Sequence, residues 1–163
     1  MAKYSSNWIG ITATAVADST NFTDSGYPLF LQGGNSTQRL IISEIYIGGE
    51  ESSTSNPTSF VVARDSTVGA TGIGGARTTL LDGSATAPGT VAVVGNSSTT
   101  KPQRSTSYLL SPSMNAYGGI VRWVPAPGNE LIVVGNGTSF GEISLSSRSG
   151  TGKTSGHFLY EIA

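Results

Sequence analysis

Apolar and polar residues alternate with a period of two through most of this chain. The alternation is clearest in WIGITATAVA at residues 8–17 and in QRLIISEIYI at residues 38–47. It predicts half-buried strands, because successive side chains of a β-strand point to opposite faces. We find no apolar periodicity typical of a helix longer than two turns. The predicted strands are residues 8–17, 29–31, 38–47, 60–64, 78–81, 90–94, 119–124, 130–134, 139–146 and 157–162.

Turn-forming residues separate these segments. Asn136-Gly137 stands between residues 131–134 and 140–145 and predicts a type I′ hairpin, because both central residues of that turn need positive φ. Gly33-Gly34-Asn35 and Pro127-Gly128-Asn129 predict further turns. About nine strands at this spacing predict one all-β domain over residues 1–163, an antiparallel β-sandwich best described as a jelly roll.

Three of the predicted strands are apolar on both faces. Residues 131–134 (LIVV) and 91–94 (VAVV) contain no polar residue. Over residues 40–47, a strict period of two puts Ile41, Ile45 and Ile47 on one face and Leu40, Ile42 and Tyr46 on the other. A small sandwich exposes the outer face of each sheet, so this pattern predicts that a loop, an arm or another subunit covers that face. We favour a second subunit over self-covering.

Few residues in the composition can do acid–base or nucleophilic chemistry. The chain has no cysteine, one histidine (His157), 12% charged residues and a net charge of −1. Enzymes draw mostly on His, Cys, Lys and carboxylates, so we expect a protein that acts through its surface and not an enzyme. The lack of a basic patch argues against nucleic acid, and one histidine without cysteine argues against the common transition-metal sites. We expect no cofactor, no secretory signal and no membrane span.

Three motif matches lack the context that their chemistry needs. The sequence GTSFG at 137–141 matches the nucleophile elbow and leaves a hydrolase using Ser139 and His157 as a third hypothesis, although the elbow needs a strand-to-helix turn. GTGKT at 150–154 resembles the end of a P-loop, but Ser147 replaces its first glycine, and a strand pattern follows. GIGGAR at 72–77 has Arg77 where a dinucleotide-binding loop has glycine.

Paired loop carboxylates could in principle bind calcium. Asp18 with Asp24 and Glu50 with Glu51 are the two candidate pairs. Neither has EF-hand spacing, so we favour solvated loop charges and predict no metal site.

Aromatic residues and one arginine are the remaining candidates for contacts with a partner. Residues 1–8 are expected to form an extended N-terminal arm, which makes Lys3, Tyr4 and Trp8 interface candidates. Arg122 lies between Val121 and Trp123 and points away from them, which a buried salt bridge or an interface contact would explain equally well. For Trp123 and Phe158 we expect core packing.

Four blocks of the sequence resemble small accessory structural proteins of tailed bacteriophages. They are RLIISEIYIGG at 39–49, ARDSTV at 63–68, YGGIVRWV at 117–124 and the turn PGNE at 127–130. The resemblance implies a capsid decoration (cement) protein with a jelly-roll-like fold, usually a homotrimer, on the outer capsid surface of the virion. Its partner would be the major capsid protein, and it would stabilise the shell by bridging capsomers. The alternative is a carbohydrate- or receptor-binding β-sandwich module of a phage fibre or spike.

Overall fold

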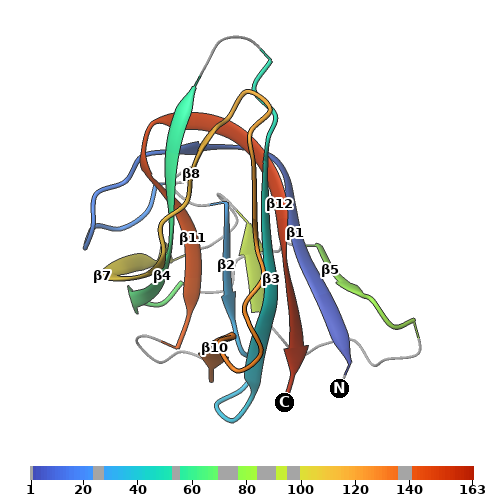
Figure 1. Cartoon of the computed structure of the whole chain (residues 1–163). Coiled ribbons are helices and arrows are strands. Elements are labelled where there is room, and N and C mark those ends of the chain that lie inside the picture. Colours follow the sequence, from blue (N-terminus) through green and yellow to red (C-terminus); the bar gives the residue numbers. More distant parts are fainter. Residues whose placement is uncertain are drawn as a thin grey trace.

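In this computed structural model, every regular element of the described part of the chain is a β-strand (Figure 1). The structure describes residues 2–23, 28–52, 56–69, 77–83, 91–94, 100–135 and 141–163, without the side chains of 77–78 and 91–94. Over these residues the strands are β1 Lys3–Thr14, β2 Leu29–Gln32, β3 Arg39–Gly49, β4 Pro57–Thr67, β5 Arg77–Leu80, β6 Val91–Val94, β7 Gln103–Leu110, β8 Ser113–Asn115, β9 Ile120–Trp123, β10 Leu131–Val134, β11 Ile143–Ser149 and β12 Thr151–Ile162.

The strands form two antiparallel sheets that pack against each other. Sheet A has the order β10-β3-β12-β1-β5, with β9 also paired to β3. Sheet B has the order β6-β2-β11-β4-β7, with β8 also paired to β4. Consecutive strands often lie in different sheets, so the chain crosses repeatedly between the two layers (Figure 1). The predicted all-β, antiparallel sandwich is therefore confirmed.

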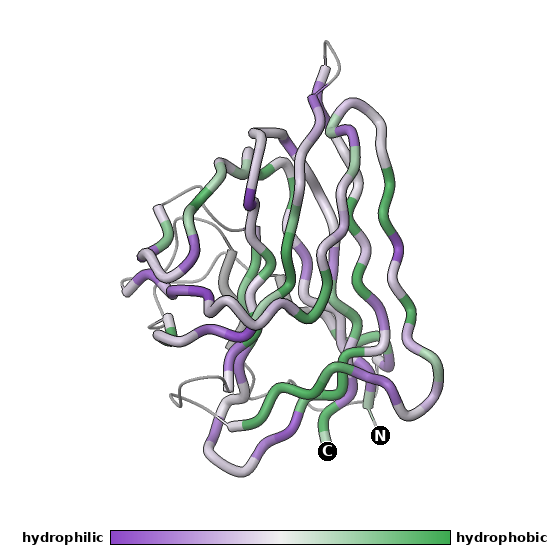
Figure 2. Tube along the Cα trace, turned by 60° about the vertical axis from the view of Figure 1, so that its left-hand side comes forward, coloured by the Kyte–Doolittle hydropathy of each residue, from purple (hydrophilic) through white to green (hydrophobic). Residues whose placement is uncertain are grey.

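The core lies between the inner faces of the two sheets. In Figure 2, hydrophobic and hydrophilic residues alternate along the strands, as a one-sided core requires. Aromatic side chains fill the sheet A side: the rings of Trp8 and Phe158 meet edge to face at 6.3 Å, and those of Tyr4 and Tyr160 stack at 5.8 Å. The core assignment of Phe158 is confirmed, and Trp123 packs against the same cluster while remaining partly exposed.

The expected N-terminal arm is wrong for residues 3–8, which belong to β1 inside sheet A. Tyr4 pairs with Tyr160 of β12 on one side and with Leu80 of β5 on the other. Tyr4 is 5% exposed and Trp8 2%, so neither is available to a neighbouring molecule. The physical reason is that the alternation continues upstream of Trp8, with Tyr4 and Ser6 also facing the core.

A β-bulge in β3 corrects the prediction that this strand is apolar on both faces. Opposite β3, Leu159 pairs with Glu44 but the next residue of β12 pairs with Ile42, which leaves Ser43 as an extra residue. The extra residue shifts the alternation by one position. Leu40, Ile42, Ile45 and Ile47 consequently all face the core and are at most 1% exposed.

A second bulge lies in β1, at Ile9 and Gly10. Strict alternation over residues 8–17 would put Ile9 on the same face as Ile11 and Ala13. Instead the register shifts between Trp8 and Ile11, Gly10 adopts φ +63°, and Ile9 is 66% exposed. Glycine fits this position because it reaches positive φ without steric cost.

The predicted hairpin around Asn136-Gly137 is wrong as a strand pairing. β10 pairs with β3 in sheet A, whereas β11 pairs with β2 and β4 in sheet B. The dipeptide itself lies outside the described residues. Two other predicted turns are confirmed: Asn35 Oδ1 accepts a hydrogen bond of 2.9 Å from the Gln38 amide, and Gly128 has φ +88° between β9 and β10.

Candidate functional site

An apolar strip is exposed along one edge of sheet A. β9 and β10 pair with successive parts of β3, Ile120 opposite Gly48 and Ile132 opposite Ile41. Ile120 of β9, Val124 just after β9, and Ile132 and Val134 of β10 form what we call the apolar edge; they are 66, 55, 37 and 41% exposed. The prediction of a strand apolar on both faces thus holds for β10, whose outer residues are uncovered in the single chain.

Beside the apolar edge, Arg122 and His157 both bind Glu44. The guanidinium of Arg122 donates to Glu44 Oε2 from Nη2 at 2.7 Å and from Nε at 3.1 Å. His157 Nε2 lies 3.0 Å from Glu44 Oε1. The Arg122 hydrogen bond is the largest influence on Glu44 and lowers the pKa of its carboxyl. Arg122 does form a salt bridge, but it is 64% exposed, so the explanation of a buried salt bridge is wrong in its burial. A role of Arg122 in an interface stays a prediction.

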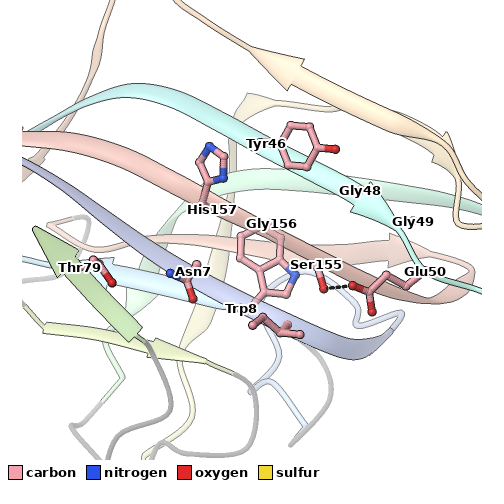
Figure 3. A pocket seen from close by; sticks show the side chains of 11 residues that line it. Asn7, Trp8, Tyr46, Gly48, Gly49, Glu50, Thr79, Ser155, Gly156 and His157 are labelled. Atoms are coloured by element: carbon pink, nitrogen blue, oxygen red, sulfur yellow. Dashed lines mark hydrogen bonds between the residues drawn. The ribbon is translucent and has the colours of Figure 1, made fainter. Parts of the chain in front are cut away.

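A groove crosses the outer face of sheet A next to this network (Figure 3). Its volume is about 630 Å³. Tyr46 of β3 and His157 of β12 pair across the strands, and their rings stack at 5.4 Å with planes 12° apart. The remaining lining comes from neighbouring strands and from Glu50: Asn7, Trp8, Ile9, Gly48, Gly49, Thr79, Ser155 and Gly156.

The bulge in β1 shapes one end of the groove. The Gly10 amide donates to Ser155 Oγ at 2.8 Å, and the Ser155 hydroxyl in turn donates to Glu50 Oε1 (Figure 3). Ile9, displaced outward by the bulge, forms an apolar wall. Bulges commonly redirect side chains next to binding sites.

A second polar cluster lies inside sheet B and was missed by the sequence analysis. Asp65 and Glu142 are both 0% exposed. Burial raises the pKa of Asp65 to about 7 and that of Glu142 to about 11, the latter raised further by the neighbouring Asp65 carboxylate. Ser144 donates to Asp65 Oδ1 at 2.6 Å, and the Gly69 amide donates to Glu142 at 3.1 Å. A protonated Glu142 supplies the donor that the buried Asp65 Oδ2 otherwise lacks.

A further group of polar side chains surrounds Arg104 of β7, at the edge of sheet B next to Asp65 of β4. Arg104 is 0% exposed and donates to Asp18 Oδ1 at 2.8 Å and to Ser146 Oγ at 2.7 Å. Burial raises the pKa of Asp18, but hydrogen bonds from Tyr108 and Arg104 outweigh this effect and lower it overall. Asp18 therefore serves as the partner of a buried arginine.

The other sequence-predicted residues are spread over the molecule. Lys3 is on the surface, with Nζ 3.4 Å from Glu161 Oε1. Glu50 binds Ser155, whereas Glu51 accepts a hydrogen bond of 2.9 Å from the Lys153 amide. Among the residues that the structure describes, no group of three or more His, Cys, Asp and Glu could hold a metal ion. Ser139 and Asp24 lie outside that part of the chain.

The P-loop-like segment 150–154 is a bend followed by a strand. Gly150 has φ +77° and links β11 of sheet B to β12 of sheet A, so it joins the two layers and is not a hairpin within one sheet. No helix in the described part of the chain is long and apolar enough to cross a membrane. In comparisons with known proteins, no family model and no curated protein matches the chain.

Proposed function

We propose that this chain is a virion structural protein, a decoration (cement) protein that binds the outer surface of a tailed-phage capsid as a homotrimer. The observation that carries the proposal is the apolar edge. Ile132 and Val134 of β10 stand exposed along one side of β3, and Ile120 and Val124 stand exposed further along the same strand, with Arg122 between them. Uncovered apolar side chains on a sheet edge are typical of surfaces that become buried against a partner.

The proposed mechanism is mechanical. The apolar edge would contact a second copy or the major capsid protein, and the trimer would bridge adjacent capsomers. Many weak contacts repeated by symmetry give high avidity without a single strong site. Jelly-roll winding of the strands is part of this proposal, supported by the repeated crossing of the chain between the two sheets.

Light scattering after size exclusion and co-sedimentation with expanded capsids of the same phage test the proposal. The wild type should elute as a trimer and sediment with the shells. Ile132→Lys combined with Val134→Lys should abolish one or both properties, because lysine cannot be buried unpaired in an apolar contact. Leu81→Lys is the matched control, since Leu81 is 53% exposed and follows β5 at the opposite edge of sheet A.

A monomer that does not sediment with capsids would overturn the decoration function. Monomeric protein that binds cells of a bacterial host would favour the alternative, a receptor-binding module of a fibre or spike. If Leu81→Lys impairs assembly as much as the double variant does, the apolar edge is not the contact surface.

A further inference from the structure

The groove on sheet A has the dimensions and the rigidity of a small-ligand site. Its volume of about 630 Å³ falls within the roughly 300–1,000 Å³ that is typical of such sites. Side chains from β1, β3, β5 and β12 contribute to its lining. These strands are neighbours in one hydrogen-bonded sheet, so the lining residues are held at fixed spacings before any ligand arrives.

An ordered aromatic surface forms one side of the groove. The Tyr46 ring stacks on His157, which is held by Glu44, and Glu44 is held by Arg122. Position 48 is glycine, and a Cβ there would lie 3.3 Å from the Tyr46 ring, so the ring covers the backbone closely. Ile9 supplies a second apolar surface. The Tyr46 ring and the Ile9 side chain are thus two apolar surfaces that the fold holds in a fixed orientation.

Polar groups alternate with these apolar surfaces around the groove. Asn7 and Thr79 line it from β1 and β5, while Ser155 and the Glu50 carboxylate line it from the other side (Figure 3). Glu50 brings a negative charge, and the nearest cation described, Lys153 Nζ, lies 4.0 Å from its Oε2 and belongs to that ion pair. Arg122 is bound to Glu44. This charge arrangement disfavours phosphates and other anions.

We propose that this groove binds a neutral saccharide. A sugar ring presents an apolar C–H face, which fits against Tyr46 and Ile9. Its rim of hydroxyl groups fits the Glu50 carboxylate, the Asn7 amide and the Thr79 hydroxyl. The open shape of the groove suits a terminal or extended saccharide unit. This site is separate from the apolar edge and does not depend on the decoration function.

Saturation-transfer NMR on the full chain tests the proposal. The probes are the methyl glycosides of glucose, galactose, mannose, rhamnose and N-acetylglucosamine, with sialyllactose as an anionic comparison. At least one neutral glycoside should receive saturation, and titration should shift the resonances of Tyr46 and His157. Absence of transfer from every neutral glycoside at millimolar concentration overturns the proposal, as does a preference for sialyllactose through its carboxylate.

Variants separate the groove from non-specific binding. Tyr46→Ala should weaken the affinity about tenfold, because it removes the aromatic surface. Glu50→Gln should weaken it about threefold to tenfold, because a charge-assisted hydrogen bond becomes a neutral one. Ile9→Ser changes an exposed side chain, so it tests the site even if Tyr46→Ala unfolds. Tyr117→Ala is the control, since Tyr117 is 54% exposed and does not line the groove. Equal loss in Tyr117→Ala would overturn the assignment.

Discussion

Two arginines of this protein, each bound to a carboxylate, show how differently the two sheets use charge. Arg122 on sheet A is 64% exposed and binds Glu44 at the surface, beside the groove. Arg104 on sheet B is fully buried, and its contacts hold Asp18, Ser146 and the Ser147 carbonyl. An exposed ion pair adds little to stability because water screens it, whereas breaking a buried pair leaves desolvated groups unpaired. Sheet A thus holds its arginine–carboxylate pair at the surface, whereas sheet B uses the corresponding pair as internal structure.

The largest expected effect is from Arg104→Ala. Arg104 also lies 5.9 Å from the Phe22 ring and so fixes the segment after β1 onto sheet B. Its loss should lower the free energy of unfolding by about 3 kcal/mol, measured by urea denaturation. Arg104→Lys should restore little of this, because one ammonium cannot reproduce the planar set of donors. Full stability in Arg104→Ala would contradict the structural role assigned to sheet B.

The next effect concerns pH and the buried pair of Asp65 and Glu142. Both pKa values are raised, so the folded state holds protons that the unfolded chain releases above about pH 4. Stability should therefore fall as pH rises above about 4, until about pH 7 for the Asp65 proton and toward pH 11 for the Glu142 proton, by up to ~1.4 kcal/mol per pH unit for each proton retained. Asp18 and Glu44 have lowered pKa values and contribute the opposite slope below pH 4.

Glu142→Gln isolates this effect, because an amide still donates to Asp65 but cannot lose a proton. The variant should be more stable than the wild type at pH 8 and should show a weaker decline between pH 5 and pH 8 in thermal unfolding. Glu130→Gln, at the turn before β10, is the control and should leave the slope unchanged. An identical slope in Glu142→Gln would mean that the pair does not titrate as assigned.

A smaller effect is expected from Gly10→Ala in the β1 bulge. Alanine at φ +63° should cost about 1 kcal/mol in the free energy of unfolding. Gly118→Ala is a matched control, because Gly118 has φ +76° with open space around a Cβ and does not line the groove. Both variants should lose similar stability, but only Gly10→Ala should shift Ile9 and Ser155 and weaken saccharide binding. Equal saccharide affinity in the two variants would show that the β1 bulge does not shape the groove for binding.

Strands could be predicted from the sequence wherever an apolar run stands between turn residues. The predicted strands 29–31 and 130–134 match β2 and β10 to within one residue for this reason. β7 and β8 were missed, because β7 is largely polar at the edge of sheet B and β8 has only three residues. The pairing of β10 could not be inferred, since nearby turn residues suggest a local hairpin while the actual partner, β3, is distant in the chain.

The candidate site was harder to predict than the fold, because it depends on register and on distant residues. Glu44 and His157 are 113 positions apart, and they meet only because β3 and β12 are neighbours. Period-two alternation cannot reveal the bulges at Ser43 and Gly10, which reverse the faces of the residues that follow. Tyr4 and Trp8 were placed at an interface for the related reason that the start of β1 was set too late.

The smallest expected effect is from Arg122→Ala, the surface counterpart of Arg104→Ala. Because Arg122 is solvent-exposed, thermal unfolding should change little, whereas the pKa of Glu44 should rise toward its ordinary value. Glu44 would then hold His157 less firmly, and saccharide affinity should fall by less than in Tyr46→Ala. NMR titration of Glu44 and glycoside titration measure the two consequences. A loss of stability comparable to that of Arg104→Ala would remove the distinction between the two sheets.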